Sequence, residues 1–152
     1  MQHLIAVLIR QMRDVQFILF GTDREQKENN AEFKEWVDMR WLAEQCSVMV
    51  RIVQHDSTPL SCLDFIQFGR EVITNIPNFP YMHYIDTGDM FMFDKCDHLM
   101  KEANVIVDEI KKAIYDLKKG KGKLNCEEAR NYYRKEFGQN QYLEKMRCLS
   151  RA

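Results

Sequence analysis

Residues 48–59, VMVRIVQHDSTP, form the stretch that decides the fold. The first six residues, 48–53, are almost entirely apolar and rich in branched side chains, which is typical of a strand buried in a sheet. The polar residues 54–56 (QHD) end that strand. Residues 57–59 (STP) are typical of a helix start, where Ser or Thr caps the helix and Pro opens it. A buried strand that leads through a short loop into a helix predicts an α/β fold.

The neighbouring segments repeat this alternation of strands and helices. Residues 15–20 predict a second strand, and residues 3–9 fit either a buried strand or a short helix. Residues 81–86 and 89–94 flank a tight turn that contains Gly88, which predicts a β-hairpin. Helices are expected at residues 25–46, 59–76, 96–119 and 126–148, the last of them interrupted near Gly138.

The helix at 96–119 has the most regular pattern, because its apolar residues keep helical spacing over about six turns. Gly120 and Gly122 end this helix, and Asn125, followed three residues later by Glu128, resembles a capping box that opens the next one.

These elements predict a single three-layer α/β domain over residues 1–152, with a mixed central sheet of about four or five strands flanked by helices. Residues 1–117 form its acidic body, and residues 118–152 add a basic loop and a C-terminal helix packed on that body. With the helix at 96–119, this last helix is expected to form a basic helical hairpin. The chain has 152 residues, 45% of them hydrophobic, and is therefore long enough and apolar enough to bury one core.

The distribution of apolar residues and cysteines predicts the cellular compartment. The early apolar run, residues 4–9, is too short for a signal peptide, and no later stretch approaches the roughly 20 apolar residues of a membrane span. The five cysteines are odd in number and at least 16 residues apart, which fits reduced thiols and no zinc site. We expect an intracellular protein of the cytoplasm or nucleus that makes no membrane contact.

The charges are divided unevenly along the chain. Residues 1–110 carry 10 Lys and Arg against 18 Asp and Glu, a net charge of −8, whereas residues 111–152 carry 12 against 5, a net charge of +7. This asymmetry indicates that the C-terminal part meets something acidic, which could be nucleic acid, a partner protein or the body of its own fold.

Three predicted strands end in carboxylates, namely Asp23, Asp56 and the pair Asp86 and Asp89. If the strands run parallel, their carboxyl ends face one crevice, which is the usual ligand position in an open α/β sheet. Such carboxylates could hold Mg²⁺ or Mn²⁺, which would bridge phosphate oxygens and activate a water. His55, beside Asp56, could then act as the catalytic base. The alternative is that these acids only cap helices and turns.

Basic residues predict contacts with phosphate in two places. Arg24 follows Gly21 at an expected helix start, where backbone N–H groups favour an anion. The C-terminal part interleaves basic residues with Tyr132 and Tyr133, a composition that suits nucleic acid, although the tyrosines could instead pack on the body of the domain. The basic residues expected to bind phosphate there are Lys119, Lys121, Lys123, Arg130, Arg134 and Lys135.

Two functions follow from these features. The first is a protein that handles nucleic acid or nucleotides through divalent-cation-dependent phosphoester chemistry, with His55 and Asp56 as catalytic residues. The chain has neither of the standard nucleotide-binding loops, GxxxxGK[ST] or GxGxxG. The second is a small, non-catalytic regulatory or inhibitory protein that binds a partner protein through its helical tail or an edge strand. The sequence leaves the choice between enzyme and binding protein open, and with it the oligomeric state.

Overall fold

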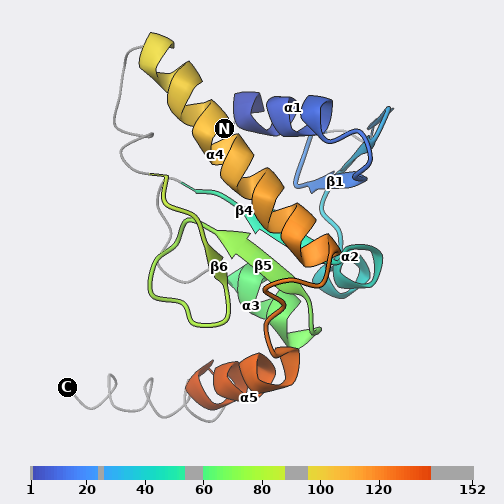
Figure 1. Ribbon diagram of the computed structural model, residues 1–152. Coiled ribbons are helices and arrows are strands. Elements are labelled where there is room, and N and C mark those ends of the chain that lie inside the picture. The colour runs from blue at the N-terminus through green and yellow to red at the C-terminus, as the bar shows by residue number, and fades with distance from the viewer. Residues whose placement is uncertain (1, 24–25, 54–59, 88–95, 138–152) are drawn as a thin grey trace, which may run out of the picture.

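The computed structural model describes residues 2–23, 26–53, 60–87 and 96–137 (Figure 1). Within these residues the chain has mixed α/β character, with five helices and six strands. The helices are α1 (Gln2–Gln11), α2 (Met39–Gln45), α3 (Leu60–Gln67), α4 (Cys96–Lys118) and α5 (Cys126–Phe137). The strands are β1 (Phe17–Phe20), β2 (Gln26–Glu28), β3 (Ala31–Lys34), β4 (Val48–Arg51), β5 (Glu71–Thr74) and β6 (His83–Tyr84).

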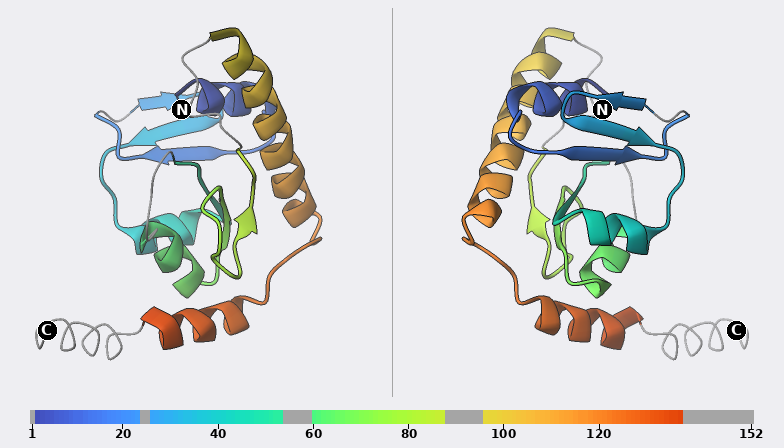
Figure 2. Two further views of the ribbon diagram at one scale, coloured as in Figure 1. Left: turned by 90° about the vertical axis from the view of Figure 1, so that its left-hand side faces the viewer. Right: turned by 90° about the vertical axis from the view of Figure 1, so that its right-hand side faces the viewer.

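The described strands form two sheets of three strands, which corrects the expectation of one central sheet with about four or five. Sheet A has the order β1-β3-β2, with β1 parallel and β2 antiparallel to β3. Sheet B has the order β4-β5-β6, and all of its strands run parallel. Figure 2 shows sheet A at one end of the molecule, α5 at the other, and sheet B between them.

Helices cover both faces of sheet B and form the expected layers around it. On one face, β4 and β5 residues such as Val50 and Ile73 pack against apolar side chains of α1 and α4. On the other face, Met49, Val72 and Met82 pack against α2, α3 and α5. Val72 and Ile73 are both fully buried, because successive side chains of a strand point to opposite faces. The same two views show α4 on one side of sheet B and α2 with α3 on the other (Figure 2).

Several of the expected elements are confirmed. β1 and β4 lie within the predicted strands, α4 matches the predicted helix at 96–119, and α1 confirms the helical alternative for residues 3–9. The Asn125 Oδ1 atom accepts a hydrogen bond from the Glu128 N–H group (3.2 Å), which confirms that Asn125 caps α5. The part of the predicted last helix beyond Phe137 lies outside the described residues.

The predicted helix at 25–46 is wrong over most of its length. Residues 26–34 form the β2–β3 hairpin, whose two-residue turn is Asn29-Asn30, with Asn29 at a positive φ of 45°. Asn favours such turns because it tolerates the left-handed backbone conformation. Only α2 is helical, and it begins after Asp38, whose carboxylate accepts hydrogen bonds from the N–H groups of Arg40 (2.7 Å) and Trp41 (3.3 Å).

The predicted helix at 59–76 ends early, because Gly69 stops it. Gly69 has a φ of +73°, its N–H group donates to the Ile66 carbonyl (2.8 Å), and the Arg70 N–H group donates to the Phe65 carbonyl (3.0 Å). These two bonds are those of a Schellman cap, which reverses the chain after a helix. Residues 71–74 then form β5, the central strand of sheet B.

The expected helical hairpin is replaced by other packing, and only the first strand of the expected β-hairpin at 81–94 lies among the described residues. β6 pairs in parallel with β5, and the expected partner strand at 89–94 lies outside the described residues. The antiparallel edge is instead β2 in sheet A. α4 packs mainly on α1 and α5 mainly on α3, so the two helices do not form the expected helical hairpin. Among the described helices, none is both long and apolar enough to span a membrane.

Candidate functional site

The parallel strands of sheet B end together, and one asparagine connects them. We name this place the carboxyl edge, residues 52–53, 74–76 and 85–87. The Asn75 side chain accepts a hydrogen bond from the Val53 N–H group (3.0 Å) and donates to the Val53 carbonyl (2.7 Å). Its amide also donates to the Thr87 hydroxyl (3.1 Å). Asn75 therefore ties the segment after β4 and the segment after β6 to the end of β5.

Further hydrogen bonds hold the same edge. The fully buried Thr74 accepts a bond from the Ile76 N–H group at its hydroxyl (3.2 Å) and from the Ile85 N–H group at its carbonyl (2.9 Å). Asp86, exposed to solvent, directly follows the buried Ile85. The carboxyl edge is thus a fixed rim that carries an exposed carboxylate.

The predicted acidic residues are distributed over two sheets. Asp86 lies at the carboxyl edge of sheet B, whereas Asp23 follows β1 in sheet A. His55, Asp56 and Asp89 lie outside the described residues, in segments that the chain joins to this edge at Val53 and Thr87. Among the side chains that the structure describes, no three His, Cys, Asp or Glu groups come together as a metal site.

The turn after β1 opens no helix. The Thr22 hydroxyl donates to the Lys34 carbonyl (2.9 Å), and the N–H groups of Gly21 and Thr22 donate to the carbonyls of Glu35 (3.3 Å) and Lys34 (3.1 Å). These bonds join the ends of β1 and β3, and the next element is β2. The expected helix start at Thr22 or Asp23 is therefore wrong, and Arg24 lies outside the described residues.

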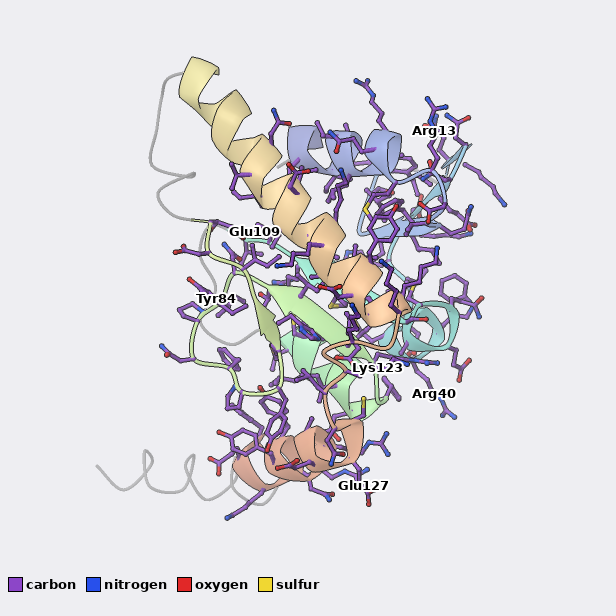
Figure 3. All side chains as sticks on the ribbon, viewed as in Figure 1. Arg13, Arg40, Tyr84, Glu109, Lys123 and Glu127 are labelled. Atoms are coloured by element: carbon purple, nitrogen blue, oxygen red, sulfur yellow. The ribbon has the colours of Figure 1, made fainter. Side chains whose placement is uncertain are left out.

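The connector between α4 and α5 lies at the opposite end of sheet B, the amino edge. Glu71, the first residue of β5, is buried, and its carboxylate accepts a hydrogen bond from the Leu124 N–H group (3.2 Å). The other oxygen of the carboxylate lies 2.9 Å from the His83 Nε2 atom. Figure 3 shows Lys123 on this connector, near the end of α4.

The predicted basic residues lie on this connector and on α5. Lys119, Lys121, Lys123 and Lys135 are exposed. Arg130 packs against Gly69, because a Cβ atom at Gly69 would lie 2.7 Å from the Arg130 Nη2 atom. Arg134 donates from Nε to the Gln67 side chain (3.3 Å). Because Gly69 and Glu71 precede or begin β5, the structure separates these basic groups from the carboxyl edge.

The tyrosines of α5 pack on the body of the protein. Tyr133 is buried, and its hydroxyl donates to the Pro80 carbonyl. Its ring contacts Tyr132, which in turn contacts Tyr81. Burial is the main cause that raises the pKa of Tyr133 above its ordinary range. These rings stabilise the docking of α5.

Three residues that organise the ends of sheet B were not among the predicted site residues, namely Asn75, Glu71 and His83. Glu71 and Asn75 flank the apolar segment Val-Ile-Thr, which was assigned to a helix. The available signal was Gly69 followed by a short run rich in branched residues, which is typical of a helix end followed by a strand.

Comparison with known proteins identifies no relative: the chain matches no protein-family model, no curated protein and no solved structure.

Proposed function

We propose that the protein binds a nucleotide at the carboxyl edge of sheet B and catalyses phosphoester hydrolysis there with a divalent cation. The observation that carries the proposal is the bridge by Asn75, which fixes the ends of three parallel strands relative to one another. Ligands of open α/β sheets bind outside the carboxyl ends of the strands, because the loops that leave parallel strands open there.

The order of elements around β4 supports a phosphate ligand. β4, α3 and β5 form a β–α–β unit with parallel strands, so the segment that joins β4 to α3 leaves from the carboxyl edge. The N-terminus of a helix in this position presents unpaired N–H groups and the positive end of its dipole, both of which favour phosphate.

The acidic residues joined to this edge would supply the cation site. Asp56, Asp86 and Asp89 would hold Mg²⁺ or Mn²⁺ through carboxylate oxygens. His55 would take the proton of a water as its oxygen attacks phosphorus, while the bond from phosphorus to the leaving oxygen breaks and that oxygen takes up a proton. Asp23, in sheet A, has no part in the proposal.

A nucleotide is a better-supported ligand than a nucleic acid. A protein that binds single strands needs exposed aromatic rings beside basic groups, so that bases can stack. Tyr133 is buried, Tyr132 packs against it, and the basic connector lies at the amino edge. Because α5 also buries Ala129 in the body, a partner protein held by this tail has less support.

Ligand-dependent stabilisation tests the proposal. Thermal unfolding is measured with nucleoside mono-, di- and triphosphates, with and without Mg²⁺ or Mn²⁺, and released phosphate is assayed in parallel. A nucleotide at 100 times its Kd adds about 2.7 kcal/mol, which raises Tm by about 5 to 10 °C for a chain of this size.

Two variants locate the effect. Asp86→Asn should fold normally and lose most of the stabilisation that depends on the cation, whereas Glu109→Gln, an exposed residue of α4, should behave as wild type (Figure 3). The proposal fails if no nucleotide raises Tm under any cation condition, or if the two variants lose the effect equally.

A further inference from the structure

One surface of the molecule combines an exposed tryptophan with four exposed carboxylates. We name it the acidic tryptophan face: Asp23, Glu35, Trp36, Asp38 and Asp64. Trp36 is 83% exposed. All four carboxylates are exposed, and among the described residues none of them forms an ion pair. This surface therefore carries concentrated negative charge around an accessible indole ring.

Contacts between three segments hold this face together. The Gly21 N–H group donates to the Glu35 carbonyl (3.3 Å), which places the turn that contains Asp23 beside Trp36. The carboxylate of Asp38 lies close to that of Asp64: partial burial is the first cause that raises the pKa of Asp64, and the charge of Asp38 raises it further. The edge of the face therefore reaches from the end of β1 across the start of α2 to α3.

The chemistry of the face favours a cationic partner. The Trp36 ring makes an edge-on contact with the Phe20 ring, with centroids 6.4 Å apart, and otherwise faces solvent over most of its surface. An indole face attracts Lys and Arg side chains, and nearby carboxylates strengthen that attraction. Tryptophan is also among the residues most enriched in protein interfaces.

The same chain presents a suitable cationic segment, the lysine loop, which consists of residues 119–123. Lys119, Lys121 and Lys123 are exposed and form no ion pair among the described residues. Gly120 and Gly122 both have positive φ, at 76° and 66°, and alternate with the lysines. The loop is anchored beyond its last lysine by the Leu124–Glu71 hydrogen bond (3.2 Å).

The two surfaces cannot meet within one molecule. Figure 2 shows α2 and the loop that follows α4 on opposite sides of sheet B. Their charges are complementary, in line with the net charge of −8 for residues 1–110 and +7 for residues 111–152. We infer that the lysine loop of one molecule binds the acidic tryptophan face of a second copy, so that copies associate head to tail.

This arrangement makes the association sensitive to salt and allows further copies to add to each end of the assembly. A head-to-tail contact uses different surfaces on the two copies and produces rings or chains. Exposed charges are screened within about 10 Å at 0.1 M salt, so added salt should weaken the contact.

Sedimentation and light scattering of the full chain test the inference. At low salt the average mass should rise above the monomer mass of 18.2 kDa as concentration increases, and should return to it at about 0.5 M NaCl. Trp36→Ala should weaken association about tenfold without changing the charge.

Charge reversal provides the decisive measurement. The face variant Glu35→Lys/Asp64→Lys leaves the α2 cap Asp38 intact, and the loop variant Lys119→Glu/Lys121→Glu leaves the Leu124 contact intact. Each variant alone should remain monomeric, and an equimolar mixture of the two should associate again. Glu109→Lys and Arg13→Glu, exposed elsewhere, are the matched controls and should associate as wild type (Figure 3).

Circular dichroism establishes first that every variant is folded. The inference is overturned if the wild-type chain stays at 18.2 kDa under all conditions. It is also overturned if the mixture fails to associate, or if the controls disrupt association as strongly as the reversals do.

Discussion

Asn30 joins the end of α1 to sheet A through a single side chain. The two N–H bonds of its amide are shared among three carbonyls, those of Ile9 (3.2 Å), Met12 (2.9 Å) and Val15 (2.9 Å), while its own backbone carbonyl accepts from the Phe17 N–H group (2.8 Å). The residue is buried. The carbonyls at a helix end need such donors because no later turn of the helix supplies them.

Asn30→Asp should therefore destabilise the protein strongly although the side chain keeps its size. The change replaces the donating amide by a carboxylate oxygen that faces three carbonyl oxygens, and should cost about 3 kcal/mol or more of unfolding free energy. Urea denaturation at pH 7 measures it. Asn29→Asp, one residue earlier in the exposed turn, should change stability by less than about 1 kcal/mol. Equal losses in the two variants would contradict the role of Asn30.

Asn30 and Asn75 also show what a sequence alone does not reveal. Each asparagine bonds backbone groups 15 or more residues away along the chain. Such partners become neighbours only after the strands have paired, so no local pattern marks these two residues. The caps of α2 and α5 differ, because Asp38 and Asn125 bond N–H groups two or three residues later.

Gly69 affects the order of elements directly, because it ends α3 and allows β5 to begin. Its φ of +73° equals that of Gly21, but the surroundings of the two glycines differ. A Cβ atom at Gly69 would meet the Arg130 Nη2 atom at 2.7 Å, whereas one at Gly21 would meet nothing within 4 Å. A comparison of substitutions at the two glycines therefore distinguishes the cost of backbone strain from the cost of steric crowding.

Gly69→Ala should cost more than Gly21→Ala. Each change carries about 1 kcal/mol for the left-handed backbone, and Gly69→Ala adds about another 0.5 to 1 kcal/mol because Arg130 must move. Chemical denaturation of both variants gives the difference. In a chain that already carries Arg130→Ala, the two glycine changes should cost the same. A difference that persists there would show that crowding by Arg130 is not its cause.

An element was predicted correctly where neighbouring residues determine it, and wrongly where residues far away in the chain do. α4 was predicted well because its apolar spacing and the glycines that end it lie in one continuous segment of the sequence. The helix expected at 59–76 is confirmed over residues 60–67 and was wrong beyond them, because Ile73 and Ile76 continue the helical spacing of Leu63 and Ile66 by coincidence, across a strand. The helix expected at 25–46 was wrong before residue 39 for a related reason: β3 pairs with β1, which lies earlier in the chain, and β2 pairs with β3.

Two hydrophobic clusters, one on each face of sheet B, contain the buried apolar side chains that hold the described part of the chain together. α5 closes the second cluster with Ala129 and Tyr133, which are 2% and 1% exposed. Tyr133 also contacts Phe137, whose side chain is 46% exposed. α5 thus contributes to the core, in addition to carrying charged side chains on its exposed face.

Removal of the Tyr133 side chain should destabilise the whole protein and not only its last helix. Tyr133→Ala should cost about 3 to 5 kcal/mol, because it leaves a cavity against α3 and the 80–82 segment. Phe137→Ala, on the same helix, should cost about 1 kcal/mol or less. Unfolding followed both by far-ultraviolet circular dichroism and by tryptophan fluorescence distinguishes global from local loss. A second transition confined to one probe would contradict the role assigned to Tyr133.

Part of the candidate site could be predicted from a general rule about parallel strands, and part of it depended on contacts between distant residues. The rule that ligands lie beyond the carboxyl ends of parallel strands led to Asp86, which the structure places at that edge. The expectation that the basic C-terminal residues share this ligand depended on the course of the chain after α4. That course is set by Glu71, which binds Leu124 at the amino edge, and no spacing in the sequence indicates it.

The central strand β5 has different attachments at its two ends. Its first residue binds the connector that leads to α5, and Asn75, next to its last residue, binds the segments after β4 and β6. The strand is only four residues long, about 13 Å, and is buried throughout. Because so few residues separate its two ends, we expect a displacement at the Asn75 end of β5 to reach the connector to α5 as well.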